Sequence, residues 1–429
     1  MTEVIKADGK REIELLNKLN DRSESAGSET DKIVAEILTD VKRNGDSAVL
    51  KYTKRFDGCE FESMEVTKTQ IEAAYKSVEP KLLRAMKISV ENVRAFHERQ
   101  TQQGFVADDK PGVVLGQIVR GLDRVGIYVP GGRASYPSSV IMNAVPAKVA
   151  RVREIIMTTP PDKDGNIPDV ILAAAYIAGV DRIFKTGGAQ AIGALAYGTE
   201  TIPRVDKIVG PGNTYVAAAK RMVFGQVDID MIAGPSEVMV VADESGDAAY
   251  IAADLMSQAE HDPMASCILA VTDETLALDV VSQIKIQLSN IPKRDIISEA
   301  FKNYGAIVLF DSMDKALDFA NMFAPEHLEL MVENPMEAMK KIINAGSVFL
   351  GKYSPEPLGD YLAGPNHVLP TNGTARFFSP LSVDSFVKRM SFINYSEEVL
   401  AEVSGDIQTF AEAEGLYAHS NSIKVRMKK

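Results

Sequence analysis

The chain has 429 residues, of which 45% are apolar and 25% charged, and 47 Lys and Arg against 59 Asp and Glu give a formal charge of -12. This length predicts two or more domains, and the composition is that of a well-packed globular protein. The negative charge argues against a nucleic-acid partner, because an acidic surface repels a polyanion unless it contains a basic patch, and the run from Lys424 to Lys429 is too small to serve as one.

The two cysteines, Cys59 and Cys267, are isolated, so the sequence predicts neither a disulfide framework nor a thiolate metal cluster. The first thirty residues lack the apolar core of a signal peptide, and no window approaches the roughly 18 uncharged apolar residues of a membrane span. We therefore expect a cytoplasmic protein that does not cross a membrane.

The first hundred residues predict mostly helix. Apolar side chains recur at helical spacing over 33–41, and a second long helical region is predicted over 71–97. Two apolar runs, 113–119 and 125–129, then predict a pair of strands.

A repeating order of strand, glycine turn and helix begins at this point. Gly131-Gly132 follows the strand at 125–129, Gly187-Gly188 follows 182–185, and the run 210–213 follows 205–209. This order predicts a parallel sheet with its helix N-termini gathered at one edge, where a nucleotide can bind. The chain has neither a G-x-G-x-x-G motif nor a P-loop, and tight turns need glycine with or without a ligand, so these turns alone favour a structural role.

A second set of strands follows Gly234-Pro235-Ser236. The apolar runs at 238–242, 268–271, 307–310 and 348–350 are separated by helical segments, which predicts a second α/β block. From about Pro380 the pattern is irregular and then helical over 399–413, which predicts a small terminal element without another sheet layer.

Four of the five histidines lie in the last 170 or so residues, each beside other metal-binding or proton-transfer groups. The runs are 258–262, 325–327, 359–367 and 414–419. Histidine titrates near neutrality and is the commonest metal ligand, so this concentration of a scarce residue predicts a reactive site, most simply that of a metalloenzyme.

A metal centre is one interpretation of these runs. Gln258 and His261 lie three residues apart on a predicted helix that Pro263 ends, so both project from one face, although a solvated polar helix end fits this run equally well. Asp360 lies in a Pro/Gly-rich loop, where it also suits a turn, and His419 alone would suit a surface position. Together, an amide, a carboxylate and two imidazoles form a ligand set for Zn²⁺ or Mn²⁺.

Glu326-His327 is the candidate for proton transfer. The pair follows Pro325 and precedes a predicted strand at 328–332, so we expect it in a loop at a sheet edge. Two adjacent titratable side chains can serve different steps of one reaction. A helix-end acid beside a buried histidine bonded to backbone explains the same residues.

Motifs over nearly the whole chain resemble, in order, those of the histidinol dehydrogenase family. They are Gly126-Ile-Tyr-Val-Pro-Gly-Gly132, Tyr136-Pro-Ser-Ser-Val-Ile-Met-Asn143, Gly187-Gly-Ala-Gln-Ala-Ile192, Ile208-Val-Gly-Pro-Gly-Asn213, Ile232-Ala-Gly-Pro-Ser-Glu237, Ser257-Gln-Ala-Glu-His-Asp262, Ala324-Pro-Glu-His-Leu-Glu-Leu330, Gly359-Asp-Tyr-Leu-Ala-Gly-Pro-Asn-His-Val-Leu-Pro370 and Ala413-Glu-Gly-Leu-Tyr-Ala-His419. The resemblance implies a zinc- and NAD-dependent enzyme that oxidises L-histidinol through L-histidinal to L-histidine, the last steps of histidine biosynthesis.

The resemblance also implies roles for single residues. The zinc ligands fall on Gln258, His261, Asp360 and His419, and the proton-transfer pair on Glu326 and His327. The NAD contacts fall on Tyr128, Gln190 and Asn213. The substrate contacts fall on Ser236, Glu414 and His327 together with the zinc ligands.

The implied fold is α/β, with two incomplete Rossmann-like, doubly wound domains and small N- and C-terminal elements in an intertwined homodimer. An N-terminal segment, 1–21, precedes a discontinuous larger domain, 22–127 and 236–380, which carries the zinc and catalytic residues. The inserted domain, 128–235, carries the NAD contacts. The tail, 381–429, completes the partner's site.

The expected chemistry has two hydride transfers to two NAD. His327 removes the alcohol proton, and Glu326 then activates water to attack the aldehyde. Cys267 falls in a predicted strand interior and suits the core better than a thiohemiacetal route. The alternatives are a dehydrogenase of the same fold for another small alcohol, such as a sulfonated diol, and a zinc hydrolase; a non-catalytic binding protein would have no use for the Glu-His pair.

Overall fold

The structure is a computed structural model that describes residues 4–20, 27–60, 63–131 and 135–427. Gly132 of the first glycine turn and Lys428 and Lys429 of the basic tail lie outside the described residues, as do parts of the N-terminal segment. The chain forms two compact units: one comprises Met1–Gln100 and Leu122–Phe386, the other Thr101–Gly121 and Val387–Lys429.

The first unit contains a six-stranded parallel sheet built mainly from the second half of the chain. Its strands are apolar on both faces because helices cover both faces, as parallel sheets require. The order is β1 (Val4–Lys6), β11 (Gly305–Leu309), β10 (Ser266–Val271), β9 (Glu237–Ala242), β12 (His327–Met331) and β13 (Ser347–Leu350).

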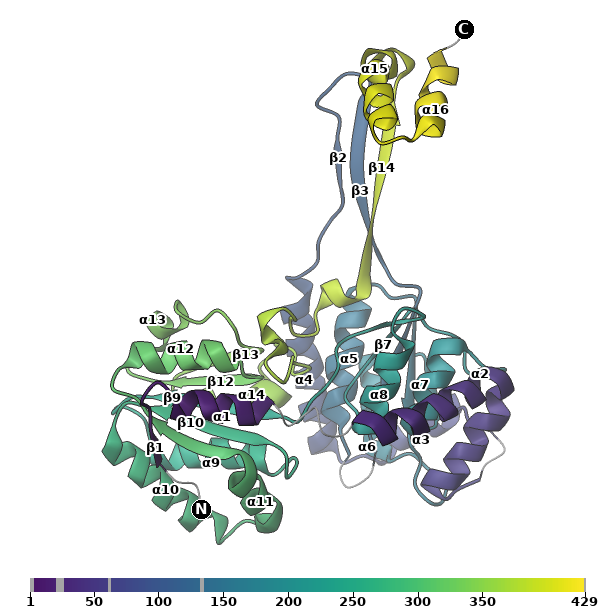
Figure 1. Ribbon diagram of the computed structural model, residues 1–429. Helices are drawn as coiled ribbons and strands as arrows, with labels where there is room; N and C mark the ends of the chain where they lie inside the picture. Colours follow the sequence, from purple (N-terminus) through teal and green to yellow (C-terminus); the bar gives the residue numbers. More distant parts are fainter. Residues whose placement is uncertain (1–3, 21–26, 61–62, 132–134, 428–429) are drawn as a thin grey trace. The chain divides into compact units, whose positions relative to one another are not determined.

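Two groups of helices pack on the two faces of this sheet (Figure 1). One face carries α9 (Ala248–Ala259), α10 (Glu274–Leu288) and α11 (Arg294–Tyr304), and the other carries α1 (Arg11–Asn20), α12 (Met313–Phe323) and α13 (Pro335–Met339). Asp247, Asp273 and Ser312 begin α9, α10 and α12, each accepting hydrogen bonds from backbone N–H groups of the first turn. The N-terminal segment thus adds a strand and a helix to the larger sheet.

The first unit also contains a five-stranded parallel sheet. Its order is β6 (Arg182–Lys185), β5 (Glu154–Thr159), β4 (Arg124–Tyr128), β7 (Lys207–Val209) and β8 (Asp228–Ile229). One face packs against α2 (Gly27–Asp57), α7 (Gly188–Tyr197) and α8 (Thr214–Val223). The remaining helices of this region are α5 (Pro137–Val149) and α6 (Asp169–Ala178), against which α3 (Lys68–Ser77) and α4 (Pro80–Glu98) pack.

The second unit is a three-stranded antiparallel sheet followed by two helices. The strands are β14 (Val387–Tyr395), β3 (Val113–Gly121) and β2 (Phe105–Ala107), in that order, and α15 (Glu397–Ala413) packs on α16 (Tyr417–Met427). The first unit closes with α14 (Glu356–Tyr361) and two short 3-10 helices, η2 (Thr374–Arg376) and η3 (Val383–Phe386).

The expected α/β class with two parallel, Rossmann-like sheets is confirmed, and so is the helical first hundred residues. The predicted pairing of 113–119 with 125–129 is wrong, because β3 pairs with β14 and β4 joins a different sheet. The absence of a further sheet layer after Pro380 is also wrong, since 387–395 forms β14. Both errors have one cause: the partner strand of β3 lies more than 250 residues away in the sequence.

Over the described residues, no helix has both the length and the apolar composition that a bilayer crossing requires.

A buried ion pair holds the turn after β7. Lys220 and Asp230 are almost fully buried and bonded to each other, Lys220 Nζ donates to the carbonyl of Gly210 at 3.0 Å, and the N–H of Gly210 donates to Asp230 at 2.8 Å. Gly210 has φ of +114°, and a Cβ there would lie 2.1 Å from the carbonyl oxygen of Tyr128, so no other residue fits.

We predict that Asp230→Asn destabilises the protein by about 3–5 kcal/mol, because Lys220 keeps its buried charge without a counter-ion. The neighbouring pair Lys207–Asp228, 2.8 Å apart with Asp228 half exposed, is the matched control, and Asp228→Asn should cost no more than about 1 kcal/mol. Urea unfolding measures both. Equal losses in the two variants would contradict a structural role for the buried pair.

Candidate active site

The predicted catalytic residues gather at the amino ends of strands in the six-stranded sheet. Ser236 immediately precedes β9, Glu326 immediately precedes β12, and His327 is the first residue of β12. His261 lies in the turn that leads from α9 to β10. Glu326 lies in the loop before β12, as expected, whereas His327 begins the strand itself, and β12 is an internal strand between β9 and β13.

His327 is buried and held in one orientation by the backbone. Its Nδ1 lies 3.0 Å from the carbonyl oxygen of Glu237, an atom that can only accept, so Nδ1 carries the hydrogen. Nε2 is buried and has no hydrogen-bond partner among the described residues. Burial lowers the pKa of His327, so the ring is neutral at pH 7 with its lone pair on Nε2.

The backbone of Glu237 also holds Glu326. The N–H of Glu237 donates to Oε2 of Glu326 at 2.9 Å, and that oxygen lies 3.8 Å from Nδ1 of His327. Burial raises the pKa of the Glu326 carboxyl well above its usual value. A carboxylate in such a place is a strong proton acceptor, which is the property required of a general base.

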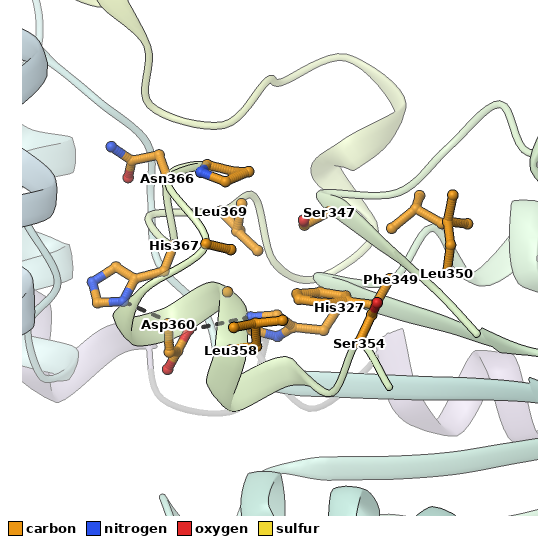
Figure 2. Close-up of a pocket in the computed structure, with 14 residues that line it drawn as sticks. His327, Ser347, Phe349, Leu350, Ser354, Leu358, Asp360, Asn366, His367 and Leu369 are labelled. Atoms are coloured by element: carbon orange, nitrogen blue, oxygen red, sulfur yellow. Dashed lines mark ion pairs between the residues drawn. The ribbon is translucent and has the colours of Figure 1, made fainter. Parts of the chain in front are cut away.

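Asp360 faces two histidines (Figure 2). Its Oδ1 lies 4.0 Å from Nε2 of His327 and 3.6 Å from Nδ1 of His367. Burial alone would raise the pKa of Asp360, but His367, His327 and His261 together hold that pKa below its usual value. Asp360 lies in helix α14, so the predicted Pro/Gly loop is wrong: Pro355 precedes the first turn and does not prevent a helix.

Gln258 and His261 lie on either side of the end of α9. The helix ends at Ala259 with Glu260 as its C-cap, so His261 is exposed in the turn that follows and does not lie on the helix as predicted. Its charge still acts on the carboxyls of Asp360 and Glu356. Gln258 is buried, and its Oε1 has no hydrogen-bond partner among the described residues.

The other two predicted residues belong to the second unit. His419 lies in α16, Glu414 is the C-cap of α15, and both side chains are exposed. The first unit therefore supplies three of the four predicted metal ligands, namely Gln258, His261 and Asp360.

Among the described His, Cys, Asp and Glu residues, the group that could hold a metal ion is His327, Glu356 and Asp360, whose donor atoms all lie within 4.8 Å of one another. Ser257 donates to Glu356 at 2.8 Å, and the buried amide oxygen of the next residue, Gln258, has no hydrogen-bond partner among the described residues. Nitrogen and oxygen donors of this kind suit Zn²⁺, and a cation would also relieve the buried negative charge of the carboxyls. The residues present therefore fit a divalent metal.

Sequence reasoning missed Asp254, Glu329 and Glu356 here, and it gave His367, which lies in a predicted reactive run, no role. Glu329 is buried in β12 and accepts the N–H of Glu356 at 2.9 Å, which ties the strand of His327 to the helix of Asp360. Burial raises the pKa of Glu329, and the neighbouring Asp254 raises it further. A charged residue inside the apolar run 328–332 was the available signal.

A cavity of about 280 Å³ adjoins this group (Figure 2). His327, Asp360 and His367 supply its polar wall, and Phe349, Leu358 and Leu369 are among its apolar lining. The volume suits a small molecule with few heavy atoms, so a small polar substrate fits beside Nε2 of His327.

The glycine turns surround a second, larger cavity of about 960 Å³ at the carboxyl ends of the five-stranded sheet. Tyr128, Gln190 and Asn213, the three predicted NAD contacts, all line it. Their backbones belong to the end of β4, the first turn of α7 and the N-cap of α8. The turns are therefore brought to one place, as ligand sites in parallel sheets are.

The wall of this cavity includes a buried amide without hydrogen-bond partners among the described residues. Gln190 is buried, and neither its Oε1 nor its Nε2 has a hydrogen-bond partner among the described residues. The N–H of Gly188 donates to the Tyr128 hydroxyl at 3.1 Å. The volume of the cavity, the unpartnered amide of Gln190 and the N-termini of α7 and α8 together fit a dinucleotide.

We predict that Gln258→Leu stabilises the metal-stripped protein by about 1–3 kcal/mol, because it removes a buried acceptor that has no partner. The same change should weaken zinc binding. Gln287→Leu is the control, since Gln287 donates to the carbonyl of Ala249 at 2.8 Å and its loss should cost about 0.5–1.5 kcal/mol. Urea unfolding after chelation measures both, and destabilisation by Gln258→Leu would show that the amide is satisfied without metal.

Comparison with known proteins shows the family of this chain. The family model of histidinol dehydrogenase matches residues 20–427. The histidinol dehydrogenase of Clostridium acetobutylicum is 58% identical over 410 residues, covering 96% of this chain and 95% of its own, and that of Geobacter sulfurreducens is 53% identical with 95% of each chain covered.

A solved structure agrees. The crystal structure of histidinol dehydrogenase from Elizabethkingia anophelis matches with a TM-score of 0.93 and 39% identity, covering 99% of this chain and 98% of the other. The chain belongs to the histidinol dehydrogenase family.

Proposed function

We propose that the chain oxidises L-histidinol through L-histidinal to L-histidine, with zinc as the metal and two NAD consumed. Family membership makes it an NAD-dependent oxidoreductase of histidine biosynthesis. The observation that carries the proposal is the neutral, unpartnered Nε2 of His327, which faces Asp360 beside a small cavity.

Gln258, His261, Asp360 and His419 are the proposed zinc ligands. Zinc held by these residues would supply a template that orients the substrate, and NAD held in the larger cavity would supply the hydride acceptor. Glu356 is a further carboxyl within reach of the site, since its donor atom lies in one group with those of His327 and Asp360. Ser236 and Glu414 complete the proposed substrate contacts, and Tyr128, Gln190 and Asn213 the NAD contacts.

His327 acts as the base in the first oxidation. Its Nε2 has the lone pair, so it removes the proton of the alcohol hydroxyl as the hydride leaves the carbon that carries this hydroxyl. The Glu237 carbonyl stabilises the charged ring through Nδ1–H. The low pKa that burial gives the imidazole lets it release the proton again.

Glu326 acts in the second oxidation. It removes a proton from a water molecule that attacks the aldehyde, and its raised pKa makes it a better acceptor than an exposed carboxylate. His327 then removes the hydroxyl proton of the hydrate as the second hydride leaves. Cys267 is fully buried in β10, which favours this water route over one through a thiol.

We further propose a homodimer in which the second unit completes the partner's site. The second unit exposes many large apolar side chains for its small size, and such a surface favours association with another copy. They include Phe105, Val106, Met390, Ile393, Phe410 and Tyr417. We also propose the domain division that the resemblance implies, with one change: Thr101–Gly121 belongs with the tail and not with the larger domain. Cys59 and Cys267 are buried and form no disulfide, which suits a cytoplasmic location.

The central test is histidinol-dependent NADH formation by the purified protein, measured at 340 nm before and after chelation and again after zinc is added back. Activity that chelation removes and zinc restores is expected. A protein that forms no NADH with histidinol under any of these conditions refutes the proposal.

His327→Ala and His261→Ala should separate the base from the metal ligand. We expect His327→Ala to lower turnover about 10²- to 10⁴-fold and to retain most of its zinc. His261→Ala should weaken zinc binding by more than about 100-fold, since loss of a ligand exceeds loss of an outer partner. The zinc content of both variants is measured after dialysis. If both lose zinc equally, His327 is itself a zinc ligand, a role that its closeness to Glu356 and Asp360 permits.

Complementation tests the shared site. A His419→Ala subunit and a His327→Ala subunit are each expected to be inactive, and a heterodimer of the two should regain activity because one of its sites has both residues intact. Differently tagged subunits purified in tandem give the heterodimer, and the two homodimer variants serve as controls. A verified heterodimer without activity would show that each site is built from one chain.

A further inference from the structure

Helix α2 ends with a carboxylate at the wall of the larger cavity. Asp57 is the last residue of α2 and lines the cavity together with Tyr128, Gln190 and Asn213. Its Oδ2 is buried and has no hydrogen-bond partner among the described residues. Asp57 has no part in the chemistry proposed above. It comes from a helix that precedes all strands of the five-stranded sheet in the sequence.

The position of Asp57 is unfavourable in two independent ways. An anion at a helix C-terminus meets the negative end of the helix dipole. Burial of one oxygen without a donor costs further free energy, and desolvation raises the pKa of Asp57 to about 6. A carboxyl with this pKa is mostly ionised at pH 7.5, so it retains a charge that no described side chain neutralises.

The other carboxyls of the cavity do not share these features. Asp162 Oδ1 accepts the N–H groups of Asp164 and Asn166 at 2.9 and 2.8 Å and belongs to a turn. Glu36, also on α2, is exposed to water. Asp57 alone among these three places an unpartnered, partly desolvated oxygen beside the ligand space.

Asp57 lies close to the glycine turns. Its charge contributes to the raised pKa of Tyr128, about 12, for which burial is the main cause. The hydroxyl of Tyr128 in turn accepts the N–H of Gly188 at the start of α7. The carboxylate therefore lies near the helix N-terminus that suits a phosphate, as the ribose of a dinucleotide lies near its diphosphate.

We propose that Asp57 is a specificity residue that accepts hydrogen bonds from a ribose diol of NAD. In doubly wound folds an acid at the end of a strand reads the ribose hydroxyls. Here the acid comes from a helix that precedes the sheet, which explains why no strand-end acid identifies the site in the sequence. This inference rests on the proposed use of NAD, and it adds a residue to the three contacts already proposed.

Binding of reduced dinucleotide to the zinc-loaded protein tests the role of Asp57 without turnover. Isothermal titration calorimetry or nucleotide fluorescence gives the dissociation constants of NADH and NADPH for wild type, Asp57→Asn, Asp57→Ala and the control Glu36→Gln. We expect both Asp57 variants to bind NADH about 10- to 100-fold more weakly, the range of a charged hydrogen bond, and Glu36→Gln to match wild type within about twofold.

NADPH identifies the ribose. If Asp57→Asn gains affinity for NADPH while it loses affinity for NADH, the acid reads the adenosine ribose, where a 2′-phosphate would meet its charge. A loss of the same size for both nucleotides assigns the nicotinamide ribose. NADH binding by both Asp57 variants as tight as wild type overturns the inference and leaves the proposed function standing, whereas a wild-type protein that binds no NADH refutes the proposed function itself.

Discussion

The backbone of Glu237 is the constraint on which the candidate active site depends. Its N–H binds Glu326 and its carbonyl binds His327, so two successive peptide groups at the start of β9 orient both proposed proton-transfer residues of the neighbouring strand. Because a carbonyl can only accept, the same contact decides which nitrogen of His327 has the lone pair. The chemistry proposed for the pair follows from this backbone contact and from the burial that surrounds it.

Burial and charge act in opposite directions on neighbouring groups. Burial raises the pKa of Glu326 and lowers that of His327, while nearby histidines hold the pKa of Asp360 low despite its own burial. A neutral base, a strong carboxylate acceptor and an ionised carboxylate are thus maintained within a few ångströms. Glu356 adds a further oxygen ligand within 4.8 Å of His327 and Asp360, so this group suits a divalent cation.

The two sheets of the first unit present different ends to their ligands. The five-stranded sheet uses the carboxyl ends of its strands, where glycine turns lead to helix N-termini and a dinucleotide-sized cavity. The six-stranded sheet places Ser236, Glu326 and His327 at the amino ends of its strands, near the C-terminus of α9. Side chains held by backbone suit acid–base chemistry, whereas free N–H groups and glycine suit phosphates, so the division matches the two tasks.

The sequence by itself determined the fold class and the family and singled out Glu326 and His327 as candidates, because local periodicity and long ordered motifs are properties of the chain. It also predicted three side chains, Tyr128, Gln190 and Asn213, that meet in one cavity. Only the tertiary structure decided that β3 pairs with β14 and that Asp360 lies on a helix. It also decided that Glu329 accepts the N–H of Glu356 and that Asp57 lines the larger cavity. Those facts depend on contacts between residues far apart in the sequence, and on which polar atoms burial leaves without partners, which no local pattern encodes.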